Sequence, residues 1–450
     1  MSKKGIGAIG LVLAILFLLA ELWPVQVQAA AEWVKRYSSP GNSSDEPGAI
    51  AVDSLGNVYV SGRARGTYSH DYLTIKYNSA GAVQWRRRYN GPQGSADYAY
   101  AMAVDGSSNV YVTGESAGVS SLQDYATIKY NSAGTRQWVR RYNGPGNGND
   151  KATAVAVDGS GNVYITGESR GSGGNQDYAT MKYNSAGTRL WVKRYNGPGN
   201  GDDKATAIVV DGSGNVYVTG ESRGSGGNQD YATIKYNSAG VQQWVKRYNG
   251  AGNGLDVAKA IGRDGAGNVY VTGVCQWSAN NDFITIKYNS GGVRQWVRRY
   301  NGPGNGWDTA LAMAVDNCGT VYASGISYGA GAGGTFDYAT VKYNSAGAMQ
   351  WVRRYAGPAG GYDCVYAIVL DVTGNVYITG QSERSPGSNY DYATIKYSSA
   401  GVRQWVERYN GPANDNDTGY RIAVDGAGNA YVAGCSTGTT TGRDWVTIKY

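Results

Sequence analysis

The sequence is poor in the residue types that build most catalytic and metal sites. Its 450 residues include one histidine, His70, and four cysteines that share no Cys-x-x-Cys or Cys/His spacing. Neither a histidine-containing catalytic triad nor a multi-histidine metal site can be assembled from this set. We therefore assign no catalytic residue and no metal ligand, and an enzyme is the less favoured interpretation.

Phenylalanine and proline are also scarce, with 3 and 10 residues, and no long apolar stripe recurs at the 3.6-residue period of a helix. The chain contains 68 glycines and 38 tyrosines instead. This composition is typical of strands joined by tight turns. We expect almost no helix.

The amino-terminal segment differs from the rest of the chain. Lys3 and Lys4 precede an apolar run from Ile6 to Ala20, and a small-residue tract follows at Ala29–Ala31. This pattern predicts a secretory signal peptide over residues 1–31 and a mature chain that is secreted or on a bacterial cell surface, with the periplasm as a second location. An uncleaved anchor is the alternative, although the run is shorter than the ~20 residues that a membrane span prefers. No membrane insertion is expected after cleavage.

The remainder, residues 32–450, is an array of one unit without an internal linker. Residues 156–208 represent the unit, which recurs at intervals of 52 to 55 residues. A tryptophan marks each copy at Trp33, Trp85, Trp138, Trp191, Trp244, Trp296, Trp351 and Trp405. We interpret the eight copies as a single domain.

Each copy contains four short segments rich in β-branched and aromatic residues, such as AVAVD, NVYITG, DYATMKY and WVKRY, which we name strands A to D. Glycine-containing turns join A to B and C to D. A lone four-stranded sheet cannot bury both faces, so the blades must stack around an axis. The pattern predicts an all-β fold, an eight-bladed β-propeller of antiparallel blades. A β-helix and two smaller tandem propellers are the alternatives.

The phase of the array predicts how the ring closes. The chain begins on a D strand, Trp33–Tyr37, and ends on a C strand, Asp444–Tyr450. Trp33 also lacks the glycine that stands four residues before every other strand-D tryptophan. We predict that residues 33–37 complete the C-terminal blade and so remove an exposed sheet edge.

The repeated segments resemble the SBBP-type β-propeller repeat of bacterial exported and cell-surface proteins. Ala51–Gly62 and Ala156–Gly167 carry the resemblance, which extends over residues 32–450 with eight copies. The resemblance implies a propeller and export, and no particular activity. The turn before Trp138, NSAGTRQW, is also similar to the tryptophan-docking turn of eight-bladed quinoprotein dehydrogenases, which implies that each tryptophan stacks between neighbouring blades.

Variation in length is confined to the segments between strands B and C, such as residues 274–281 and 326–336. In a propeller the B–C and D–A connections share one face, so we expect a variable loop face that carries specificity and a plain opposite face. Cys364 and Cys435 both fall on the loop face, and they are the one pair that we expect to be close enough for a disulfide.

Three columns of eight aspartates, beginning at Asp45, Asp53 and Asp71, contain 24 of the 26 aspartates. A residue that is present in every blade is expected to have a structural role in each of them, such as capping a turn. We therefore interpret the aspartate columns as structural. Calcium bound in loops such as Asn143–Asp150 is the alternative, and no other cofactor is expected. Glu115, Glu168 and Glu221 recur in three adjacent copies and suggest a duplicated surface.

Four aromatic residues lie outside the repeated set in one sector of the loop face: Trp277, Trp307, Tyr328 and Tyr362. Aromatic faces on a polar rim stack sugars or anchor proteins, although the rings could instead pack on the glycine-rich loops. The sequence therefore predicts a monomeric binding module for an envelope or extracellular glycan or protein. Alternatives are an enzyme with a central-channel site and a purely architectural protein. Because the net charge of +7 is spread around the ring, no nucleic-acid partner is expected.

Overall fold

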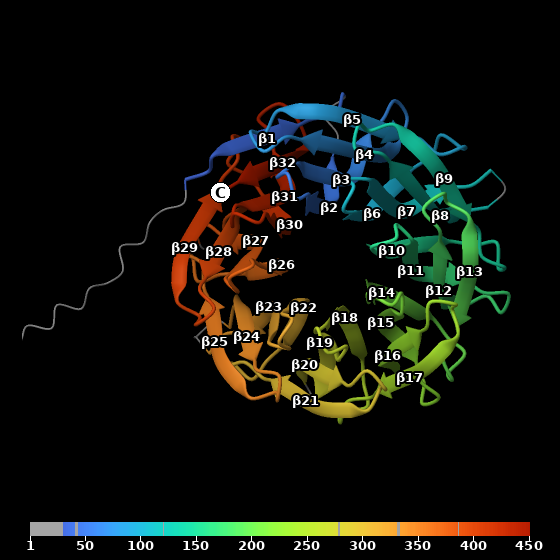
Figure 1. Cartoon of the computed structure of the whole chain (residues 1–450). Coiled ribbons are helices and arrows are strands. Elements are labelled where there is room, and N and C mark those ends of the chain that lie inside the picture. Colours follow the sequence, from blue (N-terminus) through green and yellow to red (C-terminus); the bar gives the residue numbers. More distant parts are fainter. Residues whose placement is uncertain (1–29, 41–43, 120, 278–279, 331–333, 386) are drawn as a thin grey trace, which may run out of the picture.

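The structure is a computed structural model that describes residues 30–40, 44–119, 121–277, 280–330, 334–385 and 387–450. The predicted signal peptide, apart from Ala30 and Ala31, lies outside the described residues. The described chain forms 32 strands in eight four-stranded antiparallel sheets and no helix. The sheets are the blades of one closed ring around a central channel (Figure 1). The prediction of an all-β, eight-bladed propeller is confirmed.

Blade 1 begins at β2, each later blade begins four strands further on, and blade 8 consists of β30–β32 and β1. The A strands line the channel: β2 (Glu46–Val52), β6 (Asp97–Val104), β10 (Asp150–Val157), β14 (Asp203–Val210), β18 (Asp256–Arg263), β22 (Asp308–Val315), β26 (Asp363–Leu370) and β30 (Asp417–Val424). The B strands follow: β3 (Val58–Arg65), β7 (Val110–Ala117), β11 (Val163–Arg170), β15 (Val216–Arg223), β19 (Val269–Trp277), β23 (Val321–Tyr328), β27 (Val376–Glu383) and β31 (Ala430–Thr437).

The C strands come next: β4 (His70–Tyr77), β8 (Gln123–Tyr130), β12 (Gln176–Tyr183), β16 (Gln229–Tyr236), β20 (Asn280–Tyr288), β24 (Phe336–Tyr343), β28 (Tyr390–Tyr397) and β32 (Arg443–Lys449). The D strands form the outer wall: β5 (Val83–Tyr89), β9 (Arg136–Tyr142), β13 (Arg189–Tyr195), β17 (Gln242–Tyr248), β21 (Arg294–Tyr300), β25 (Met349–Tyr355), β29 (Arg403–Tyr409) and β1 (Trp33–Tyr37).

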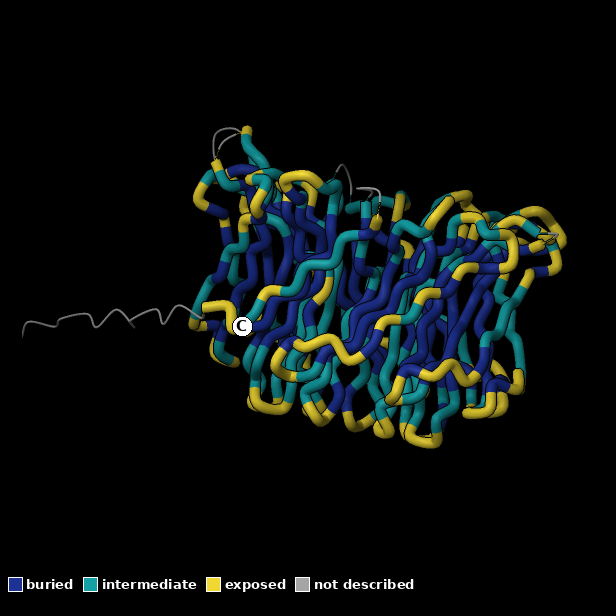
Figure 2. Tube along the Cα trace, turned by 90° about the horizontal axis from the view of Figure 1, so that it is seen from above, coloured by how far each residue is buried: buried dark blue, intermediate teal, exposed yellow. Residues whose placement is uncertain are grey.

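Both faces of the B and C strands are covered because each blade lies between two others. Their residues are therefore buried almost continuously, as in β11 and β12, whereas the D strands remain partly exposed. The core consists of eight clusters, one at each boundary between adjacent blades. Figure 2 shows the ring from the side, with buried strands between two exposed rims.

The ring closes as predicted. β1 pairs antiparallel with β32 from Trp33 opposite Lys449 to Tyr37 opposite Trp445, so the first and last strands share blade 8. The chain termini are thus held together by backbone hydrogen bonds, and β1 covers the outer edge of β32 that would otherwise be unpaired.

The predicted docking of the strand-D tryptophans is also confirmed. The Nε1 atom of Trp138 donates a hydrogen bond to the Ser185 carbonyl in the next blade, at 3.2 Å. The indole also lies against Gly187, where a Cβ atom would come within 2.9 Å of the ring. Gly187 has a φ of 81°, so this turn needs glycine for its backbone as well as for the space it leaves to the indole.

Two sequence-based expectations are wrong. The four cysteines, all within the described residues, are unpaired. Cys435 lies instead against blade 1, with its Sγ atom 3.1 Å from the Asp45 carbonyl oxygen. The B–C connections are also shorter than predicted, because strands extend into them: Trp277 and Tyr328 are the last residues of β19 and β23, and His70 is the first of β4.

Deletion of Glu32–Tyr37 tests ring closure. Without β1, the outer edge of β32 loses its pairing partner, and the core cluster between blades 8 and 1 loses the partly buried Trp33 and Tyr37. We expect the melting temperature to fall by more than about 5 °C, because even 1 kcal/mol shifts it by roughly 2–4 °C in domains of moderate size. The control is a chain that starts at Glu32. A deletion variant that melts within about 2 °C of this control would contradict the closure.

Candidate binding site on the loop face

The B–C and D–A connections meet on one face, where each B–C hairpin contacts the D–A connection that enters its own blade. The Tyr328 backbone amide donates a hydrogen bond to the Trp307 carbonyl at 3.2 Å. The Gln276 backbone amide donates one to the Leu255 carbonyl at 3.0 Å. Consequently, three sets of side chains lie together: those at the last residue of strand B, at the first residue of strand C and just before strand A. These three registers form the rim of the loop face.

Four aromatic rings form a continuous row on this rim across blades 6 and 7. The ring centroids of Tyr328 and Phe336 are 5.4 Å apart, those of Phe336 and Tyr362 are 5.7 Å apart, and those of Tyr362 and Tyr390 are 6.1 Å apart. Each pair meets edge to face, the geometry that the ring quadrupoles favour. All four side chains are half-buried, so the row is both supported and accessible. We call these four residues the aromatic row.

Other blades carry mostly polar or small residues at the same three registers. The register of Phe336 and Tyr390 holds His70, Gln123, Gln176, Gln229, Asn281 and Arg443 elsewhere. The register of Tyr362 holds Ser44, Ala96, Asn149, Asp202, Leu255, Trp307 and Asn416 elsewhere. Where polar residues occupy these registers, a hydrogen bond can join neighbouring blades. An example is the bond from the Gln176 backbone amide to the Asp202 carboxylate, at 3.0 Å. The aromatic row is therefore a local departure from the repeat.

The row ends beside a pocket of 370 Å³ between blades 7 and 8. Tyr390 forms one wall, and the other lining residues are Gln381, Asp415, Asn416, Thr418, Thr437, Gly442 and Arg443. Arg443 is held in place by a hydrogen bond to the Tyr420 hydroxyl at 3.1 Å and by an ion pair with Glu46 at 3.7 Å. Amide, carboxylate, hydroxyl and guanidinium groups thus surround a space with one aromatic wall. This combination suits a ligand rich in hydroxyl groups.

The four predicted site residues are only partly brought together. Tyr328 and Tyr362 belong to the aromatic row, joined through Phe336, which the sequence analysis did not select, as it did not select Tyr390. Tyr328 also packs down on a glycine-rich loop, since a Cβ atom on Gly306 would come within 2.5 Å of its ring. Both missed aromatics could have been found, because they replace a polar residue at the start of strand C.

Trp277 and Trp307 lie outside the row and differ from each other. Trp277 is partly buried against the core cluster between blades 4 and 5, with the Arg299 guanidinium 5.1 Å from its ring centroid. Trp307, in the connection before β22, is 59% exposed. Trp277 therefore has a packing role of its own, whereas Trp307 is presented to solvent beside the row.

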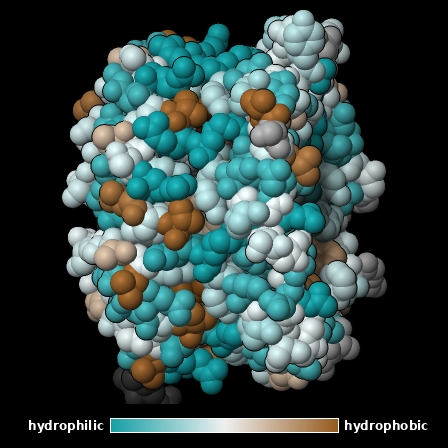
Figure 3. Space-filling model, turned by 90° about the vertical axis from the view of Figure 1, so that its right-hand side faces the viewer, coloured by the Kyte–Doolittle hydropathy of each residue, from teal (hydrophilic) through white to brown (hydrophobic). Residues whose placement is uncertain are grey.

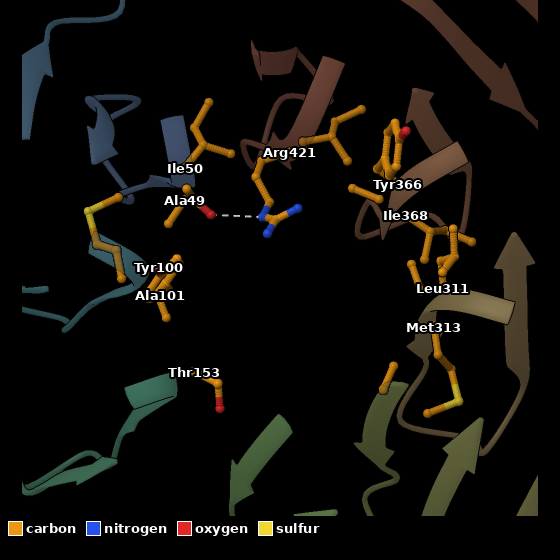
Figure 4. A pocket seen from close by; sticks show the side chains of 16 residues that line it. Ala49, Ile50, Tyr100, Ala101, Thr153, Leu311, Met313, Tyr366, Ile368 and Arg421 are labelled. Atoms are coloured by element: carbon orange, nitrogen blue, oxygen red, sulfur yellow. Dashed lines mark hydrogen bonds between the residues drawn. The ribbon is translucent and has the colours of Figure 1, made fainter. Parts of the chain in front are cut away.

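The central channel forms a second pocket of 430 Å³, lined largely by alanine, isoleucine, leucine and methionine side chains from seven of the eight blades. Its shape follows from a β-bulge that leaves one strand-A residue of every blade without a partner in strand B. These residues are Gly48, Tyr100, Thr153, Thr206, Lys259, Leu311, Tyr366 and Tyr420. Figure 4 shows Tyr100, Thr153, Leu311 and Tyr366 around the opening.

Charged side chains near the inner strands of blades 2 to 4 interact with one another. The Tyr100 hydroxyl donates to Glu115 at 2.7 Å, and Lys151 lies 4.2 Å from the Tyr100 ring centroid. Burial raises the pKa of Glu115, although the Tyr100 hydroxyl and Lys151 oppose this shift. Glu168 pairs with Lys204 at 3.6 Å. The duplicated glutamates are therefore part of an alternating charge network.

The aspartate columns bind backbone and side-chain groups of the fold. Asp150 accepts hydrogen bonds from the amides of Gly144 at 2.6 Å and Arg170 at 2.8 Å, which joins the D–A connection to strand B. Asp158 closes the A–B turn through Asn162 and Tyr164. Within the described ranges, no group of three or more His, Cys, Asp and Glu side chains is arranged to hold a metal ion. Calcium binding stays an untested alternative.

No helix among the described residues is long and apolar enough to cross a membrane. The side of the ring around β9 and β13 shows isolated hydrophobic residues among hydrophilic ones (Figure 3). Side chains such as Leu190 and Val241 contribute single exposed positions. Scattered exposure of this kind is ordinary for a protein surface.

Comparison with known proteins supports the architecture. Five segments, residues 32–67, 84–119, 137–175, 190–228 and 404–440, match the model of the SBBP beta-propeller repeat. The chain is similar in structure to Sqt1 from Chaetomium thermophilum, with a TM-score of 0.60 and 8% identity over 93% of this chain and 98% of that one.

Sqt1 bound to the N-terminus of the ribosomal protein L10 gives a TM-score of 0.58 and 8% identity over 91% of this chain and 98% of that one. No curated protein matches the chain. At this identity the likeness to Sqt1 shows the fold alone. The SBBP repeats are shown separately, by the five matched segments.

Two carboxylates of blade 7 have pKa values shifted in opposite directions, so we expect them to change the pH dependence of stability in opposite ways. Burial raises the pKa of Asp363 from 3.8 to about 6. Partial burial acts in the same direction on Asp371, but hydrogen bonds from Thr373, Asn375 and Tyr377 outweigh it and lower the pKa to about 2. The Asp363 contribution to stability therefore decreases as pH rises from 3.8 to about 6. The Asp371 contribution is lost as pH falls from 3.8 to about 2.

Urea denaturation between pH 2 and pH 8 measures both effects. Asp363→Asn should flatten the decrease in the free energy of unfolding between pH 4 and pH 6, at about 1.4 kcal/mol per pKa unit. Asp371→Asn should destabilise the protein at pH 7 and progressively less below pH 4. If the Asp363→Asn variant keeps the wild-type slope between pH 4 and pH 6, the burial of this carboxylate is misassigned.

Single alanine substitutions should separate the two tryptophans. Trp277→Ala removes a ring that packs on the core and on Arg299, so we expect a loss of about 1–3 kcal/mol and a lower melting temperature. Trp307→Ala removes an exposed side chain and should change stability by less than about 0.5 kcal/mol. The melting temperatures of both variants test this difference. Equal losses of stability would contradict a packing role for Trp277 and an exposed position for Trp307.

Proposed function

We propose that this protein is an exported binding scaffold that holds a glycan of the cell envelope or extracellular space on its loop face. The observation that carries the proposal is the aromatic row, which ends beside the pocket between blades 7 and 8 where several residues with polar side chains meet. Export is inferred from the lysines and apolar run of residues 1–31.

The chemistry of the two parts is complementary. Half-buried rings such as Phe336 and Tyr362 present apolar faces on which sugar rings stack, at small entropic cost because each ring has only two rotatable bonds. The pocket beyond Tyr390 offers donors on Arg443 and Asn416 and acceptors on Gln381 and Asp415. An elongated glycan could cover the row and place hydroxyl groups in the pocket. A site of this form does not require a catalytic group.

A protein segment is the second candidate ligand. Trp307, 59% exposed beside the row, favours it, because exposed tryptophans are frequent anchors of protein interfaces. Binding of a protein would depend mainly on Trp307, whereas binding of a glycan would depend on the row and the pocket. The two candidates therefore respond to different substitutions.

The test is a glycan array probed with the mature chain and with a triple variant, Phe336→Gln, Tyr362→Asn and Tyr390→Gln. Each replacement stands at the same register in another blade of this chain, so the variant should melt within about 3 °C of the wild type. We expect glycan binding to fall at least about tenfold, since the variant loses three aromatic contacts.

Tyr68→Ser is the matched control, because Tyr68 is an aromatic residue 84% exposed on blade 1, away from the row. This control should bind as the wild type does. A well-folded triple variant that retains its glycans, or a wild-type chain that binds none, would overturn the proposal. Loss of a bound protein in Trp307→Asn alone would favour the second candidate.

A further inference from the structure

The lining of the channel pocket includes one charged side chain that departs from the repeat. At the first strand-A residue after the bulge, seven blades carry alanine: Ala49, Ala101, Ala154, Ala207, Ala260, Ala312 and Ala367. Blade 8 carries Arg421 at this register. Among the described residues that line the channel pocket, Arg421 alone is charged.

Arg421 is held in a defined position in the channel. Its Nε atom donates to the Gly48 carbonyl at 2.8 Å, and its Nη1 atom donates to the Tyr420 carbonyl at 2.9 Å. These two bonds use only part of the five donors of a guanidinium group. Figure 4 shows the guanidinium projecting from blade 8 toward the middle of the opening. Neither of these bonds uses the donors on Nη2.

The surroundings of Arg421 have little to balance its charge. The neighbouring wall consists of Ile50 on one side and Tyr366 and Ile368 on the other, with Leu311 and Met313 beyond them. Arg421 is exposed to the channel, and desolvation by the surrounding walls lowers its pKa. Glu115, in strand B of blade 2, is engaged with Tyr100 and Lys151. An anion in the channel would supply the missing partner, and its apolar part would cover the wall.

We propose that the central channel binds a small amphiphilic carboxylate, with its head on Arg421 and its apolar tail against Ile368 and Leu311. The charged head receives hydrogen bonds from a guanidinium that the Gly48 and Tyr420 carbonyls already orient. The tail removes the isoleucine and leucine surface from water. This site is separate from the aromatic row, which lies on the rim and has different lining residues.

Calorimetric titration of the mature chain with four probes tests the proposal: octanoate, acetate, 1-octanol and octylamine. Octanoate should bind more tightly than each of the others, because it alone combines a carboxylate with an apolar tail. Arg421→Ala should weaken octanoate binding about tenfold or more and leave 1-octanol unchanged. Alanine is the residue of the other seven blades at this register, so the variant should fold.

Two further variants separate the head from the tail. Leu311→Thr, which copies Thr153 and Thr206 at the bulge register, should weaken octanoate and 1-octanol but not acetate. Arg136→Ala removes the same charge from the outer wall and should bind octanoate as the wild type does. Octanoate binding that is absent in the wild type, unchanged in Arg421→Ala, or matched by octylamine would overturn the proposal. Because the aromatic row is intact in all these variants, the result is independent of glycan binding.

Discussion

The ring depends on one arginine in each D strand, which ties its blade together and to the blade before it. Arg194 donates to the Asp177 carboxylate at 2.7 Å, to the Ser169 hydroxyl at 2.7 Å and carbonyl at 2.6 Å, and to the Tyr142 hydroxyl of the preceding blade at 3.2 Å. A planar guanidinium suits this task because its five donors can satisfy several acceptors at once. The equivalent Arg36 makes the same contacts at the closing blade, to Asp444, Ser436 and Tyr409.

Where one member of this set changes, its neighbours change with it. Blade 5 has Cys275 in place of the serine, and there Arg299 bonds Asp282 through Nε at 2.6 Å and lies over the Trp277 ring. A thiol is a weaker hydrogen-bond acceptor than a hydroxyl, so the guanidinium has an aromatic face as an alternative partner. Trp277, which stands out in the sequence, is thus accounted for by the packing of its own blade.

The sequence was sufficient for the fold because every copy supplies the same contacts. The eight-blade count, the four strands and the pairing of Trp33–Tyr37 with the last blade all follow from the phase of a repeat. The channel was not predictable in the same way. A bulge at Thr153 or Tyr366 adds one residue to strand A and so reverses which side chains face the axis, and strand patterns alone do not reveal it.

The candidate sites were predictable only in part for a related reason. Tyr328 and Tyr362 were selected because aromatic residues between strands are conspicuous. The expected proximity of Cys364 and Cys435, by contrast, assumed that residues on the same face are near each other. In a ring, nearness depends on the boundary between blades: Cys435 lies against blade 1, and Tyr362 meets Phe336 of the preceding blade. Contacts across boundaries require the orientation of each strand as well as its order.

These boundaries also determine where specificity can arise. The arginine and tryptophan contacts fix the blades from their outer halves. They run through strands C and D and, for every strand-D tryptophan except Trp405, through the turn of the next blade. The inner strand A and the rim registers are consequently able to vary without loss of the ring, as the series from Gly48 to Tyr420 at the bulge shows. A symmetric ring would present the same group eight times to any ligand on the axis. The single Arg421 and the aromatic row of blades 6 and 7 break that symmetry at positions where the fold tolerates the change, and a site that distinguishes one ligand orientation from another requires such a break.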